Sequence, residues 1–184
     1  PALARALLVV DAQPTTFERE RQQQLDANPE GHRWAVDNAW LSGSAAEVLP
    51  AVRAAYTTLP NEQAFTIWFS MAPLRELPDM AFSMQSEIYL AAYNLWPDDL
   101  APEEQAREDA RNIAWLESVM ADVEKVSVGQ YLGDSDHSRR QAKVMSDEHW
   151  ARLQEIRAVR DPDGLFVGYW CGDNPVRNVN PWEL

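Results

Sequence analysis

Apolar and polar residues alternate along several stretches of the chain with the period of two that is typical of β-strands. The predicted strands cover residues 6–10, 34–41, 63–71, 84–95 and 126–132. Alternation is most regular in residues 63–71, where Phe65, Ile67 and Phe69 share one face. A helix is not excluded for residues 84–95.

Three other stretches carry apolar residues at helical spacing and are predicted to be helices. They cover residues 44–56, 102–123 and 146–160. Ser44 and Glu47 have the form of a capping box, and Pro50 suggests a tight first turn followed by α-helix from the proline. Pro102 opens the longest helix, and Ser146 is the expected N-cap of the last one. The apolar stripe of the longest helix is predicted to be Ala106, Ala110, Ile113, Leu116, Met120 and Val123.

Strands mixed with helices in this order, without an internal repeat, favour an α+β fold. We expect a largely antiparallel sheet whose helices cover one face. The residues predicted to pack under the helices are Phe65, Ile67, Phe69, Ile88, Leu90, Ala92, Val126 and Val128. The opposite face would then show Trp68, Ser70, Tyr89, Tyr93, Gly129 and Tyr131. Because such an aromatic, hydroxyl-bearing surface is unsuited to open water, it is predicted to contact a ligand, a loop or a partner.

The whole chain, residues 1–184, is expected to form one domain. A length of 184 residues allows a sizeable core, and 46% apolar residues with eight tryptophans indicate that the chain folds. Residues 15–31 are polar, charged and rich in glutamine, and offer little to bury. They are predicted to be a linker, so that residues 1–31 form a poorly defined N-terminal segment.

The charge balance excludes two classes of partner. Sixteen basic and 29 acidic residues leave a net charge of −13, which repels nucleic acid and anionic lipid.

No apolar run approaches the roughly 20 residues of a membrane span, and the N-terminal run is too short and wrongly flanked for a signal peptide. Cys171 is alone, so it can form neither an internal disulfide nor a cysteine cluster. These features fit a cytoplasmic protein.

No metal site or hydrolytic triad is predicted from the side chains that usually build one. His32, His137 and His149 lack ligand spacing, and His137 is expected to be a solvated loop residue. Acidic pairs in polar segments are expected to be solvated surface, namely Asp98-Asp99, Glu103-Glu104 and Asp134/Asp136.

Two motifs in the last third of the chain are more specific. The string Gly129-Gln130-Tyr131-Leu132 precedes an Arg-Leu pair, a short basic helix and the sequence Asp161-Pro162-x-x-x-Phe166. This arrangement resembles the C-terminus of FAD-linked oxidases of the vanillyl alcohol oxidase superfamily. Within them it is similar to the berberine bridge enzyme branch, which includes 6-hydroxynicotine and oligosaccharide oxidases.

The resemblance implies a site between two domains, in which one domain binds FAD and the sheet of the other covers the flavin ring. It marks Tyr131 as a candidate catalytic residue, from the family's Gly-x-Tyr-x-Asn strand. Phe166 and Tyr169 become candidate cofactor contacts, although core packing is an equal alternative for both. The aromatic face supplies the candidate substrate contacts Trp68, Ser70, Tyr89 and Tyr93.

The sequence also departs from the family pattern. Gly133 stands where relatives carry the asparagine, and the aromatic-Gly-x-Asn-Tyr-x-Arg-Leu string is represented by residues 146–153 without its glycine and asparagine. With seven glycines and no glycine-rich pyrophosphate loop, the isolated chain is expected not to retain FAD.

These features predict the substrate-binding part of an FAD-dependent oxidoreductase that oxidises a small organic molecule by hydride transfer to flavin. Its partners would be that substrate and an FAD-binding domain or subunit, with a homo-oligomer possible. The alternatives are a non-catalytic α+β module for small-molecule binding or dimerisation, and a degenerate relative of the oxidases.

Overall fold

The computed structural model describes residues 14–72, 75, 78–80, 86–137 and 139–166. The predicted strand 6–10, Tyr169 and Cys171 lie outside these residues. The chain divides into two compact units, residues 1–32 and residues 33–184. The elements in chain order are α1 (Phe17–Ala27), β1 (His32–Leu41), α2 (Ala45–Thr57), β2 (Phe65–Ser70), β3 (Ile88–Pro97), α3 (Pro102–Val123), β4 (Ser127–Gly129) and α4 (Asp147–Arg160).

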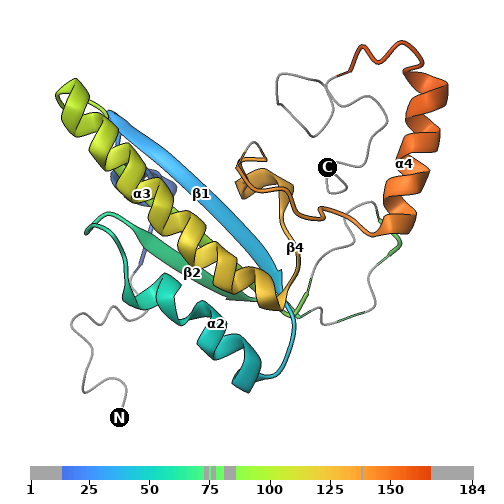
Figure 1. Cartoon of the computed structure of the whole chain (residues 1–184), viewed down its shortest axis with the longest axis horizontal. Coiled ribbons are helices and arrows are strands. Elements are labelled where there is room, and N and C mark those ends of the chain that lie inside the picture. The colour runs from blue at the N-terminus through green and yellow to red at the C-terminus, as the bar shows by residue number, and fades with distance from the viewer. Residues whose placement is uncertain (1–13, 73–74, 76–77, 81–85, 138, 167–184) are drawn as a thin grey trace. The chain divides into compact units, whose positions relative to one another are not determined.

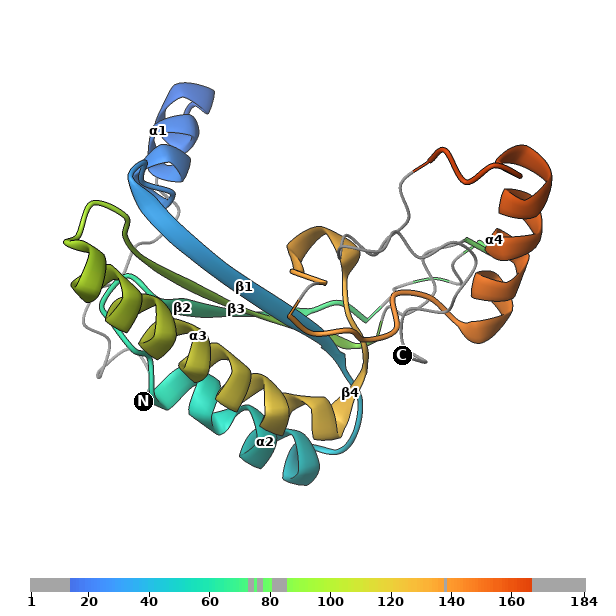
Figure 2. The same cartoon turned by 45° about the horizontal axis from the view of Figure 1, so that its top comes forward.

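The second unit is built on a four-stranded sheet with the strand order β2-β3-β1-β4. The pairs β2–β3 and β1–β4 are antiparallel, and α2 and α3 lie side by side on one face of the sheet (Figures 1 and 2). The predicted α+β fold with helices on one face is therefore confirmed. Residues 88–97 are a strand, which removes the helical alternative for this segment.

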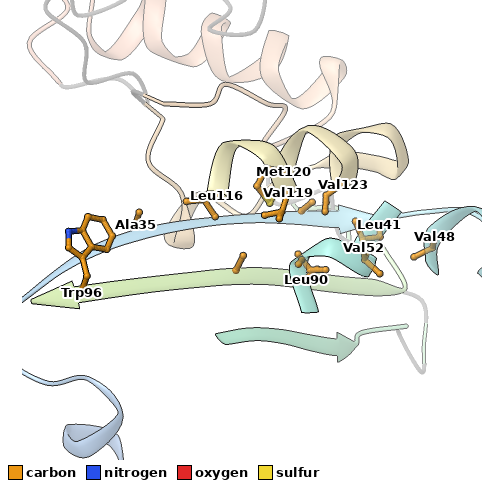
Figure 3. Packing of buried hydrophobic residues seen from close by; sticks show 13 residues of the cluster. Ala35, Leu41, Val48, Val52, Leu90, Trp96, Leu116, Val119, Met120 and Val123 are labelled. Carbon is orange, nitrogen blue, oxygen red and sulfur yellow. The ribbon is translucent and has the colours of Figure 1, made fainter. Parts of the chain in front are cut away.

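The main core lies between the sheet and the two helices (Figure 3). Its buried residues are Ala35, Ala39, Leu41, Val48, Val52, Ala55, Leu90, Ala92, Trp96, Leu116, Val119, Met120 and Val123. Small side chains on the strands allow the helices to approach closely, while the larger ones of α3 fill the remaining space. The prediction that Leu90 and Ala92 pack under the helices is confirmed.

The predicted stripe of α3 is wrong in its N-terminal half. Ala106 and Ala110 are exposed, whereas Gln105 and Asn112 are buried. The amide of Gln105 donates to the carbonyl of Pro97, and Asn112 is bonded into a group of asparagine side chains. Polar residues can take core positions when their hydrogen bonds are satisfied there, which hydrophobic spacing does not reveal.

The two faces of β2 are the reverse of the prediction. Phe65, Ile67 and Phe69 pair with Tyr93, Ala91 and Tyr89, and paired residues of neighbouring strands point to the same face. These apolar residues therefore lie opposite the helices. Trp68 and Ser70 pair with Leu90 and Ile88 and lie on the helix side. A one-residue change of register inverts every side chain of a strand, and β2 carries aromatic side chains on both faces, so local alternation does not show which face lies under the helices.

In the first unit, residues 15–31 are not only a linker. They contain the helix α1, although none of its residues is buried. Thr16 accepts a hydrogen bond from the amide of Arg19, and Glu18 and Glu20 lie in the first turn. The cap, the acidic first turn and good helix-forming residues stabilise a helix without any apolar face.

The boundaries of three other elements can be compared with the sequence prediction. α2 begins at Ala45 and contains Pro50, so the prediction that α-helix starts only at the proline is wrong. β4 ends at Gly129, three residues before the predicted limit, because the chain then enters a short 3₁₀ turn, Leu132–Asp134. The N-cap of α4 is Ser146, as predicted, and it accepts from the amide of His149. None of the helices in the described part of the chain has the length and apolar character needed to cross a membrane.

Truncation of the fully buried Leu90 should identify the face of the sheet that carries the stability. We expect Leu90→Ala to lower the free energy of unfolding by about 2–5 kcal/mol, since it leaves a cavity under α2 and α3. Leu49, which is 60% exposed on α2, is the matched control, and its replacement by alanine should change stability by less than about 1 kcal/mol. Equal losses in urea denaturation would contradict this placement of the core.

Candidate functional site

The sheet face opposite α2 and α3 carries a second cluster of aromatic side chains, which we call the tyrosine face. Its buried members are Trp40, Tyr89 and Ala91, and Ile67 and Tyr93 pack against them. The rings of Trp40 and Tyr89 are 4.9 Å apart between centroids. Two further phenylalanines of β2 extend the face: Phe65 stacks on Tyr93 at 4.8 Å, and Phe69 on Tyr89 at 6.2 Å.

One carboxylate joins the hydroxyls of this face. The Oη of Tyr89 donates to Oδ2 of Asp134 at 2.5 Å, and the Oη of Tyr93 donates to the same oxygen at 3.1 Å. Asp134 lies in the 3₁₀ turn that follows β4. The expectation that Asp134 is solvated surface, which came from its polar neighbours in the sequence, is therefore wrong. The turn places the carboxylate of Asp134 against two tyrosines of β3.

This arrangement keeps the two tyrosines in their protonated form. Burial, together with the Asp134 carboxylate, raises the pKa of Tyr93 to about 12. Burial and the hydrogen bond to Asp134 raise the pKa of the Tyr89 hydroxyl well above its usual value of about 10. Ionising either tyrosine would place a phenolate against a carboxylate in a partly desolvated site. Tyr89 and Tyr93 are therefore hydrogen-bond donors at ordinary pH.

Tyr131 lies at the border of the same face. Its side chain is 41% exposed, and its ring meets the ring of Tyr89 edge-on at 6.3 Å. The ring folds back over Gly133, where an added Cβ would be 2.7 Å from a ring carbon and 2.9 Å from the hydroxyl. Gly133 thus provides the space in which the Tyr131 ring lies. The structure brings together Tyr89, Tyr93 and Tyr131 of the predicted site residues.

The other predicted site residues lie elsewhere or cannot be placed. The prediction that Trp68 and Ser70 share the tyrosine face is wrong, because both lie on the helix side. Trp68 instead lines a shallow groove with residues of α2. Phe166 is 72% exposed, so it does not pack in the core, and only its backbone is bonded, to Asp161 and Arg157. Tyr169 lies outside the described residues.

Two polar residues of the site were missed from the sequence. Asn38 is fully buried on β1 and bonds the backbone of the turn that carries Tyr131 and Asp134. An asparagine inside a predicted strand of mostly apolar residues was the available signal. No such signal marks Asp134, because its partners Tyr93 and Tyr89 are 41 and 45 residues away in the sequence.

A histidine also lies behind the turn rather than in solvent. The imidazole of His137 is partly buried, and its Nδ1 is 2.9 Å from Nε2 of the fully buried Gln130. Burial lowers the pKa of His137, which favours the neutral ring. Within the described residues, no three His, Cys, Asp or Glu side chains group closely enough to hold a metal ion.

Comparison with known proteins relates the chain to flavoenzymes. FAD-linked oxidoreductase janO of Penicillium janthinellum is 26% identical over 177 residues, covering 94% of this chain and 38% of that protein. FAD-linked oxidoreductase nodO of Hypoxylon pulicicidum is 27% identical over 168 residues, covering 90% and 36%. FAD-linked oxidoreductase ptmO of Penicillium ochrochloron is 25% identical over 151 residues, covering 81% and 32%. A search against known protein families found no match.

A solved structure agrees at the level of the fold. CrmK, a flavoenzyme involved in shunt product recycling in caerulomycin biosynthesis, matches with a TM-score of 0.58 and 19% identity, over 90% of this chain and 34% of CrmK. The chain thus spans about a third of the length of the curated relatives it matches. The predicted resemblance to a part of FAD-linked oxidoreductases is confirmed. The berberine bridge branch stays a prediction.

The pKa values of Tyr89 and Tyr93 should depend on Asp134. Because their folded-state pKa is raised, the stability they contribute is complete below about pH 10 and is lost as pH rises toward about 12, the pKa of Tyr93. Asp134→Asn removes the negative charge, so the pKa of Tyr93 should fall but stay above its usual value because burial persists. Alkaline titration of tyrosine absorbance, with Tyr93→Phe to assign the signal, measures this change. Asp147→Asn on the exposed start of α4 is the control, and identical titrations of both variants would refute the role of Asp134.

Proposed function

We propose that this chain is the substrate-binding part of an FAD-dependent oxidoreductase, and that its tyrosine face covers the flavin ring and a small organic substrate. The observation that carries the proposal is the group of Tyr89, Tyr93 and Tyr131 around Asp134, on a sheet whose other face is closed by helices. The relatives that match this chain are FAD-linked oxidoreductases, which supports the proposal.

The residues present fit one end of FAD. Flat aromatic rings and hydroxyl groups on the tyrosine face suit a conjugated ring and a polar substrate, and Phe69 and Tyr131 are 48% and 41% exposed there. The five glycines within the described residues are well separated, at positions 31, 43, 129, 133 and 164. They do not form the glycine-rich loop whose backbone amides would hold a pyrophosphate. The nucleotide end of FAD therefore belongs to an FAD-binding domain or subunit.

The three tyrosines have different parts in the proposed chemistry. When bound, FAD supplies the acceptor for a hydride from a C–H bond of the substrate. Tyr131 is the proposed catalytic base, whose Oη takes the proton of the substrate's hydroxyl or amine as the hydride leaves the neighbouring carbon. Burial and Asp134 hold Tyr89 and Tyr93 protonated, so neither acts as a base. Each donates its one O–H to Asp134, which leaves the hydroxyl oxygens to accept hydrogen bonds from a substrate. Phe166, exposed at the end of the described chain, stays a proposed cofactor contact, as does Tyr169.

Retention of flavin should require a second domain. We expect the purified chain to lack visible flavin absorbance, and to gain it when joined to or co-expressed with an FAD-binding domain of an FAD-linked oxidoreductase. The physical reason is that the chain offers contacts to the ring but no cradle for the pyrophosphate. Flavin bands in the chain alone would contradict this division of the site. Stable dimers without flavin in either sample would favour the non-catalytic module.

Loss of the Tyr131 hydroxyl should slow the chemistry and leave the fold intact. In the flavin-loaded protein, Tyr131→Phe is expected to lower the rate constant of flavin reduction by an alcohol or amine substrate about 10²- to 10⁴-fold, the usual contribution of a positioned base. Tyr56→Phe is the matched control, because Tyr56 is 39% exposed but belongs to α2, on the helix side of the sheet.

A second variant tests the position of the ring and not its chemistry. Gly133→Ala places a methyl group where the Tyr131 ring lies, so the ring must move while its hydroxyl remains. We expect slower flavin reduction in stopped-flow measurements, in the same direction as for Tyr131→Phe. Unchanged rates in both variants would show that Tyr131 is not the proton acceptor.

A further inference from the structure

The side chain of Asn38 holds the turn on which the candidate site is built. It is fully buried in β1, beside the tyrosine face. Its Nδ2 donates to the carbonyl of Tyr131 at 2.9 Å, to the carbonyl of Asp134 at 2.9 Å and to Oγ of Ser135 at 2.8 Å. Its Oδ1 accepts from the amide of Tyr131 at 2.7 Å. One side-chain amide thus binds both ends of the turn.

These hydrogen bonds take the place of one residue pair between β1 and β4. β1 pairs with β4 at Trp40 and Gly129, and continuing this antiparallel register would place Asn38 opposite Tyr131. β4 has already ended there, and the chain turns away from the sheet. The side chain of Asn38 bonds both the amide and the carbonyl of Tyr131, as a strand partner would. The backbone can therefore leave the sheet at Tyr131 without losing its hydrogen bonds.

The far end of the same loop is fixed to the same part of β1. Arg140 donates to the carbonyl of Asn38 and makes a two-pronged ion pair with the carboxylate of Asp37. Its third branch reaches Glu124, just after α3. Arg140 thus holds the far end of the loop to β1, and Asn38 holds its start at Tyr131.

We propose that Asn38 is a positioning residue, which places Tyr131 and Asp134 against Tyr89 through the backbone of the turn. This inference rests on the proposed function, since it concerns the geometry of the proposed proton acceptor. The Asn38 amide reaches no reacting atom itself; it contacts the carbonyls of the two residues whose side chains form the site. A displacement of the turn would move the Tyr131 hydroxyl and release the Asp134 carboxylate from both tyrosines.

Two variants of Asn38 separate positioning from folding. Asn38→Ala removes the whole amide. Asn38→Asp keeps the shape and the acceptor for the Tyr131 amide, but it loses the three donor contacts and adds a charge that the carbonyls repel. Asn94→Asp is the matched control, because Asn94 is also fully buried, on the neighbouring strand, and bonds Asn61 and Asn112 far from the turn.

The first measurement needs no flavin. In the full chain, we expect the amide of Tyr131 to exchange its hydrogen at least about tenfold faster in Asn38→Ala, as a protecting hydrogen bond is lost. We expect the pKa of Tyr93 to fall from about 12 in Asn38→Asp, because Asp134 no longer faces its hydroxyl. Asn94→Asp should leave the exchange of the Tyr131 amide unchanged, and Asn94→Ala, which adds no charge next to Tyr93 in the chain, should leave the pKa of Tyr93 unchanged. Unchanged exchange and an unchanged pKa in folded Asn38 variants would overturn the proposal.

The second measurement uses the flavin-loaded protein. Asn38→Asp should lower the rate constant of flavin reduction by about 100-fold, with little change in KM, as expected for a catalytic group displaced by about 1 Å. Asn94→Asp should keep the rate. Faster exchange of the Tyr131 amide with an unchanged reduction rate would overturn the proposed role of Tyr131, while leaving Asn38 as the residue that holds the turn. A preserved turn with a slower rate would overturn the positioning role.

Discussion

Burial of β1 on both faces is the constraint on which the rest of the structure depends. Ala39 and Leu41 contact the core under α2 and α3, while Asn38 and Trp40 are covered on the other side. A strand without a solvated face must bond its polar groups within the protein. Asn38 does so with the turn that begins at Tyr131. The burial that organises the core therefore also determines where the candidate site lies.

The two faces of the sheet have different physical tasks. The helix side is apolar and close-packed, and it supplies stability. The tyrosine face is aromatic but bears hydroxyls, two of which donate to a single carboxylate, Asp134. Because burial and Asp134 raise the pKa of Tyr89 and Tyr93, these two tyrosines remain protonated. The ring of Tyr131 meets the ring of Tyr89 edge-on, and Tyr131 is more exposed than Tyr89.

The match to about a third of the length of FAD-linked oxidoreductases explains why the site is one-sided. A sheet that covers a flavin ring needs flat, hydroxyl-bearing side chains and a rigid support. It does not need the backbone amides that bind a dinucleotide. In the proposed function, the helices and β1 provide that rigidity, and Gly133 gives Tyr131 room to lie across the turn. The absence of a side chain at Gly133 thus has a steric role in this chain.

From residue 32 onward, the amino-acid sequence by itself determined the kind and order of the elements, because hydrophobic period and helix caps are local properties. It also marked Tyr131 through a short motif. The tertiary structure decided which face each residue takes. β2 carries aromatic side chains on both faces, so only its pairing with β3 shows that Phe69 and not Trp68 lies beside Tyr89. Asp134 and Asn38 gain their roles from partners 41 to 97 residues away, and contacts at that separation leave no trace in local pattern.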